Sequence, residues 1–132
     1  MNALAIPNQF AAIRMADISK LRPSGFKKIK AVYLIGCGES VKIGVSNDPA
    51  RRIGVVMRTA GKKTAQIAVT PFLSNAHEIE ASFKRDFRPY RANGEWFSVY
   101  FDDARSDILT RGWDTNPNPF DLVNSIDVGK LS

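Results

Sequence analysis

The stretch AVYLIGCGESVKIGV at residues 31–45 decides the fold. Two runs rich in β-branched and aromatic residues, 31–35 and 41–45, flank a segment with two glycines, which is typical of a β-hairpin. Side chains alternate between the faces of a strand, so Val32 and Leu34 share one face and Tyr33 points to the other. By the same alternation, Lys42 lies on the Tyr33 side. The hairpin is therefore predicted to present a phenol and an ammonium group together.

Periodicity and capping residues predict helices and further strands around this hairpin. Asp48-Pro49 indicates a helix start, because aspartate caps amides and proline suits the first helical position; Gly61 ends this helix. The other expected elements are an amphipathic helix at 8–21 capped by Asn8, a strand within 64–73, a helix at 75–87 with Asn75 and Glu78 as a capping box, a short strand at 96–100 and a helix at 102–111.

This order predicts an α+β fold: a small, mainly antiparallel three-stranded sheet flanked by helices, with an extra N-terminal helix. We divide the chain into an N-terminal helical extension at 1–26, a central domain at 27–101 and a C-terminal helix and tail at 102–132. The 132 residues, 44% of them hydrophobic and 24% charged, suit one globular domain. No apolar run or signal sequence indicates a membrane or export, and the single Cys37 fits a reducing cytoplasm.

The positive charge is concentrated in the first half of the chain. The net charge is +6, but residues 14–63 hold twelve Lys/Arg against three acids, whereas residues 74–132 hold seven against ten. A basic half predicts a polyanionic partner such as DNA, although a solvated basic surface without a partner is the alternative. The candidate nucleic-acid contacts are Lys27, Lys28, Lys30, Arg51, Arg58, Lys62 and Lys63.

Three charged residues are candidates for chemistry. Lys42 beside Tyr33 favours the phenolate and a general base, unless its stem simply covers a half-exposed tyrosine. Arg52 lies at the edge of its helix's buried stripe, where a guanidinium clamps a phosphate or forms a rim ion pair. Glu80 lies ~55° from the centre of its helix's buried face. A carboxylate there needs Mg²⁺, an ion pair with Arg52 or a backbone amide as its partner.

The order of these residues resembles the GIY-YIG nuclease family. The resemblance rests on Tyr33, on Lys42-Ile43-Gly44 and on Arg52, eight residues past Gly44. It continues in Glu80 with Phe83 and Arg88-Pro89-Tyr90, which are similar to that family's glutamate helix and its exit. Asn93-Gly94-Glu95-Trp96-Phe97 is similar to the phage and bacterial branch, in which lysine commonly replaces the second tyrosine. The resemblance covers roughly residues 30–101.

The resemblance implies a DNA endonuclease that uses one divalent metal ion, Mg²⁺ or Mn²⁺. Tyr33 would then be the general base or the group that positions water, Arg52 would stabilise transition-state charge, and Glu80 would hold the metal. Lys42 would lower the pKa of Tyr33 or contact the phosphate. Asn93 would match the family's terminal asparagine, with Glu95 as an alternative carboxylate.

Two other functions are compatible with the same residues. The first is a nucleic-acid-binding module of this fold with attenuated catalysis, because Lys42 departs from the family tyrosine and the chain is short for a separate recognition domain. The second is a small interaction or regulatory factor, which would use the acidic, aromatic C-terminal third of the chain.

Overall fold

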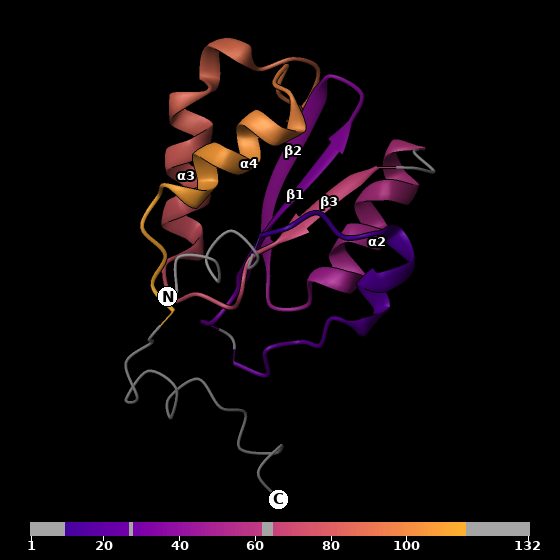
Figure 1. The fold of residues 1–132 in the computed structure, drawn as a ribbon, viewed down its shortest axis with the longest axis vertical. Coiled ribbons are helices and arrows are strands. Elements are labelled where there is room, and N and C mark those ends of the chain that lie inside the picture. Colours follow the sequence, from indigo (N-terminus) through magenta and orange to yellow (C-terminus); the bar gives the residue numbers. More distant parts are fainter. Residues whose placement is uncertain (1–9, 27, 62–64, 116–132) are drawn as a thin grey trace, which may run out of the picture.

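The computed structural model describes residues 10–26, 28–61 and 65–115, which form the predicted α+β fold (Figure 1). Its antiparallel sheet has the order β2-β1-β3, with β1 (Ala31–Cys37) between β2 (Ser40–Ser46) and β3 (Gln66–Val69). Helix α2 (Pro49–Ala60) and the 3₁₀ helix η2 (Met15–Lys20) cover one face. Helices α3 (Ala76–Asp86) and α4 (Phe101–Leu109) cover the other.

Strand β1 is buried on both faces, as expected for a central strand with helices on each side. Val32 and Leu34 belong to the apolar cluster under α3 and α4. Tyr33 and Ile35 belong to the cluster under α2. At Gly36 a Cβ atom would collide with Phe101 of α4, so glycine permits the close approach of that helix to the sheet. The alternation predicted from the sequence is confirmed.

Helix α2 begins and ends where its capping residues predict. The Asp48 carboxylate accepts a hydrogen bond from the Arg51 amide at 3.4 Å, and Pro49 occupies the first helical position. Gly61 ends the helix with a φ of 69°, the left-handed conformation that glycine adopts without a Cβ penalty. Among the described residues, no helix is long and apolar enough to cross a membrane.

The expected helix at 8–21 is wrong over its described part. Only Met15–Lys20 is helical, and it is a 3₁₀ helix. The Ile13 amide donates a hydrogen bond of 2.7 Å to the Ile67 carbonyl of β3, so this segment pairs with the sheet edge. An amide used in this way cannot also continue a helix. Asn8, the predicted cap, lies outside the described residues.

Two further expectations in the second half need correction. Asn75 makes no capping bond to α3; its side chain donates to the Gly112 carbonyl and accepts from the Asp114 amide, which ties down the segment after α4. Residues 96–100 form no strand, because only Phe97 pairs with Val41 before α4 begins at Phe101. The strand expected within 64–73 is confirmed as the shorter β3, and α4 spans 101–109 where 102–111 was expected.

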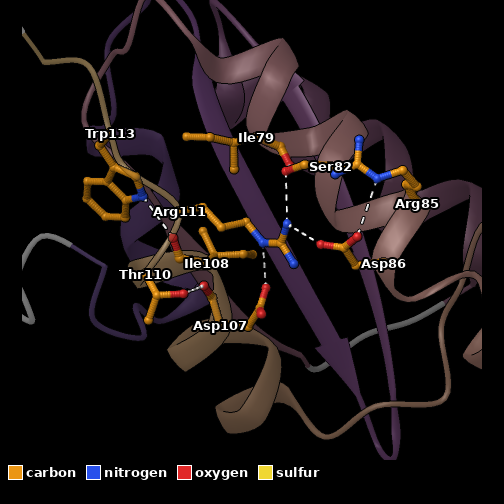
Figure 2. A network of polar contacts seen from close by, with 9 residues as sticks. All are labelled: Ile79, Ser82, Arg85, Asp86, Asp107, Ile108, Thr110, Arg111 and Trp113. Carbon is orange, nitrogen blue, oxygen red and sulfur yellow. Dashed lines mark hydrogen bonds and ion pairs between the residues drawn. The ribbon is translucent and has the colours of Figure 1, made fainter.

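Arg111 joins the two helices on this face of the sheet (Figure 2). Its guanidinium donates to Asp107 of α4 at 2.7 Å, and to Ser82 and Asp86 of α3 at 2.9 and 3.0 Å. It also lies 5.7 Å from the centre of the Phe83 ring. The side chain is only 13% exposed, so these bonds are shielded from water. Arg111 therefore fixes α3, the helix that carries Glu80, against α4.

Replacing Arg111 with methionine keeps most of the apolar stem but leaves Ser82, Asp86 and Asp107 without their shared donor. We expect the free energy of unfolding to fall by about 1–3 kcal/mol, measured by urea denaturation. Arg51→Met on the exposed side of α2 is the matched control, with an expected change within about 0.5 kcal/mol. Equal losses in the two variants would contradict the bridging role of Arg111.

Candidate active site at the edge of strand β2

Tyr33 lies at the centre of the candidate site. It pairs with Gly44 of β2, the outermost strand on this side of the sheet, and it is only 2% exposed. A Cβ atom at position 44 would overlap with the Tyr33 hydroxyl and Cζ. The phenol therefore lies across β2 in space that a side chain at position 44 would fill. Because β2 is an edge strand, this brings the hydroxyl to the edge of the sheet.

Arg52 from α2 is the cation that acts most strongly on this hydroxyl, and its side chain is exposed. Burial raises the pKa of the phenol, and the nearby Arg52 guanidinium offsets only part of that rise. The expected lowering of the Tyr33 pKa by Lys42 is therefore wrong. At neutral pH, Tyr33 is therefore a neutral hydroxyl.

Glu80 belongs to α3, on the opposite face of the sheet from α2. Its charge is among those that act on Tyr33, and its side chain is 19% exposed. Its ion-pair partner is Lys84, whose Nζ lies 3.2 Å from Oε2 of Glu80, so neither Arg52 nor a capping amide takes that place. Sequence reasoning missed Lys84, although the i, i+4 spacing on a helix was a signal for the pair.

Lys84 also contacts Glu95, at 3.1 Å. Partial burial alone would lower the pKa of Lys84, but the bonds to Glu95 and Glu80 outweigh it and raise that pKa. The same ammonium group, followed by the charge of Lys42, holds the pKa of Glu95 below its usual value. Lys84 thus stays charged at neutral pH and lies between the carboxyl groups of Glu80 and Glu95.

Lys42 lies on the same face of the sheet as Tyr33 but pairs with Ile35, two residues along the hairpin. The bridge between Val41 and Phe97 holds the preceding Glu95 and Trp96 beside β2. A hollow of about 370 Å³ opens there, lined by Lys42, Arg52, Val55, Val56, Thr59, Ala60 and Trp96. Asn93 lines a neighbouring hollow of about 320 Å³ that shares Ala60 and Trp96 as walls.

Four of the seven predicted nucleic-acid contacts belong to the described part of the chain. Lys28, Arg51 and Arg58 are exposed, and Lys30 is half-buried with its Nζ 3.2 Å from Nε2 of His77. None of these four residues lines either hollow. Lys27, Lys62 and Lys63 lie outside the described residues. DNA binding by this set of residues stays a prediction.

A divalent metal ion would have one protein carboxylate at this site. The described residues contain no group of three or more His, Cys, Asp or Glu side chains suited to a metal. Glu80 fits a Mg²⁺ ligand because it is partly exposed and already holds a cation, the Lys84 ammonium. Mg²⁺ commonly binds one or two carboxylates and takes its remaining ligands from water and phosphate oxygens.

The T5orf172 domain matches residues 30–111, which is more than half of the chain. The chain belongs to this family. T5orf172 domains are related to nuclease-like domains of the GIY-YIG and HNH types. The match runs from the first residues of the hairpin to Arg111, so the T5orf172 domain contains Tyr33, Lys42, Arg52, Glu80 and Asn93. Comparison with curated proteins and with solved structures finds no match.

The pKa of Tyr33 provides a test of this site. Tyrosinate absorbance is titrated with pH in the wild-type protein and in Tyr33→Phe, and the difference is the signal of Tyr33. We expect this signal to appear above the ordinary pKa of about 10, because burial disfavours the phenolate. In the unfolded chain the Tyr33 phenol has a pKa of about 10. The contribution of its raised pKa to the free energy of unfolding is therefore fully present below that pH, and it is lost as the pH rises through the higher pKa of the folded protein. Tyr100→Phe, which removes an exposed phenol, is the control. A difference spectrum that titrates below 10 would contradict this environment.

Proposed function

We propose that this T5orf172 domain is a metal-dependent endonuclease that hydrolyses DNA phosphodiester bonds with GIY-YIG-type chemistry. One observation carries the proposal: the charges of Arg52 from α2 and Glu80 from α3 both act on the hydroxyl of Tyr33 from β1. The three residues come from different elements on both faces of the sheet. A neutral phenol, a guanidinium and a carboxylate are the groups that phosphodiester hydrolysis needs for positioning, charge stabilisation and metal binding.

In this mechanism a water molecule attacks the phosphorus atom and releases a proton to solvent, the bond to the leaving oxygen breaks, and that oxygen takes up a proton from solvent. The Tyr33 hydroxyl orients the attacking water through a hydrogen bond, as its raised pKa leaves it protonated. Arg52 places a guanidinium where negative charge grows on the phosphoryl oxygens. Glu80 would hold Mg²⁺, which when bound polarises a phosphoryl oxygen.

Lys84 sets a condition on this mechanism. Its ammonium occupies an oxygen of Glu80 at 3.2 Å, so Glu80 must release it in order to bind a metal ion. Glu95 lies 3.1 Å from the same ammonium and can retain it during that exchange. The Lys84–Glu80 pair also favours the second candidate function, a DNA-binding module in which the lysine keeps the carboxylate and cleavage is attenuated.

The decisive experiment incubates the protein with duplex, forked, flapped and branched DNA in the presence of Mg²⁺ or Mn²⁺. We expect metal-dependent nicking, and we expect Glu80→Gln to reduce its rate by about 10²-fold or more. Glu78→Gln, an exposed substitution on the same helix, is the matched control and should cleave normally. Circular dichroism and urea unfolding check that both variants fold.

Each outcome distinguishes the two candidate functions. Nicking that Glu80→Gln abolishes supports the endonuclease. DNA that is retarded on a gel but stays intact with every metal ion supports the binding module. Undiminished cleavage by folded Glu80→Gln would contradict the proposed role of this carboxylate.

A further inference from the structure

A basic hollow lies on the side of α3 next to the candidate active site. It measures about 340 Å³, and its charged lining comes from Lys84, Arg85, Arg88, Arg91 and Glu95. Lys84 and Arg85 belong to the last turns of α3, Arg88 to the following 3₁₀ helix η3 (Arg88–Tyr90), and Arg91 and Glu95 to the segment before the Val41–Phe97 bridge. Four cations thus face one carboxylate.

Arg111 is neutralised by Asp86 and Asp107, whereas the arginines of this hollow keep most of their charge. Within the described parts of the chain, the Arg88 side chain forms no ion pair with an acid and is exposed. Arg91 uses Nε to donate to the Gly94 carbonyl at 2.9 Å, which orients its guanidinium and leaves the two terminal nitrogens as donors. Arg85 has only a long contact of 3.4 Å to Asp86. The hollow therefore keeps an excess of positive charge.

Two residues of the hollow connect it electrostatically to the candidate active site. Lys84 lines the hollow and pairs with Glu80, and Glu95 lines it while responding to the charge of Lys42. A strand with one phosphate at Glu80 and Arg52 would place neighbouring phosphates along this wall. Guanidinium groups suit this task because they form bidentate hydrogen bonds with phosphate oxygens.

We propose that Arg88 and Arg91 bind the phosphodiester backbone of the DNA strand that flanks the scissile phosphate. This rests on the proposed function and assigns the path of the substrate to the second half of the chain, where acids outnumber bases. The fold separates those charges, since Arg111 engages Asp86 and Asp107, whereas Lys84, Arg85, Arg88 and Arg91 gather in the hollow at the end of α3.

A structural explanation for the same arginines gives a different expectation. Cations near the C-terminal end of a helix stabilise it through the helix dipole. If that were their only role, their removal would lower the free energy of unfolding and leave DNA affinity unchanged. Measurements of both quantities on the same variants therefore separate the two roles.

The test compares the double variant Arg88→Gln/Arg91→Gln with Lys20→Gln/Arg22→Gln, which removes the same charge from the exposed region of η2. Binding of a fluorescent DNA strand and its duplex is followed by anisotropy over a salt series in EDTA, so that no cleavage occurs. We expect the first variant to bind about tenfold or more weakly, with the slope of log K against log salt smaller by about two. The control should change the affinity by less than about twofold.

A second variant guards against a loss of folding. Arg88→Lys/Arg91→Lys keeps both charges and should recover most of the salt slope, and urea unfolding checks each protein. Unchanged binding by the folded glutamine variant, or an equal loss in the η2 control, would overturn the proposal. If arginine-dependent binding persists in a protein that never nicks DNA, the proposed function fails while this inference stands.

Discussion

The arrangement of the candidate site depends on one contact, the phenol of Tyr33 lying across Gly44. A tyrosine on a central strand normally ends inside the core. It reaches the sheet edge here because the neighbouring edge strand has no side chain at the paired position. The ring in turn covers a glycine that would otherwise leave the strand unpacked. This contact explains why Lys42-Ile43-Gly44 ends in glycine, which lies under the Tyr33 ring. Position 42 pairs with Ile35 instead and can therefore carry a lysine side chain.

Elements on the two faces of the sheet can share a site only at such an edge. Arg52 belongs to α2 on one face and Glu80 to α3 on the other, and the Tyr33 hydroxyl senses both. Arg111 fixes α3 against α4, and the Val41–Phe97 bridge holds Glu95 beside β2. The helix and the segment that carry Glu80 and Glu95 are thus held by the Arg111 guanidinium and by the two backbone hydrogen bonds between Val41 and Phe97.

Local signals predicted the hairpin and α2, because strand alternation, Asp48-Pro49 and Gly61 act within a few residues. The cross-strand register was not fixed by alternation: a turn centred on residues 38–39 pairs Tyr33 with Gly44 and leaves Lys42 opposite Ile35. The pKa of Tyr33 was predicted in the wrong direction because its ring is buried, which raises that pKa, where a half-exposed ring beside Lys42 was expected. Ile13 and Asn75 differ from expectation because their partners, Ile67, Gly112 and Asp114, lie 37 or more residues away. The roles of Arg52, Glu80 and Asn93 stay predictions.

The most direct test of the Tyr33–Gly44 contact is a double-mutant cycle on the free energy of unfolding. An added methyl group at position 44 should destabilise the wild-type protein, because it meets the Tyr33 hydroxyl. In a Tyr33→Val background the space is empty, and Gly44→Ala should be neutral or slightly stabilising. We expect a coupling energy of about 1–3 kcal/mol. Equal effects of Gly44→Ala in both backgrounds would contradict the contact on which the site depends.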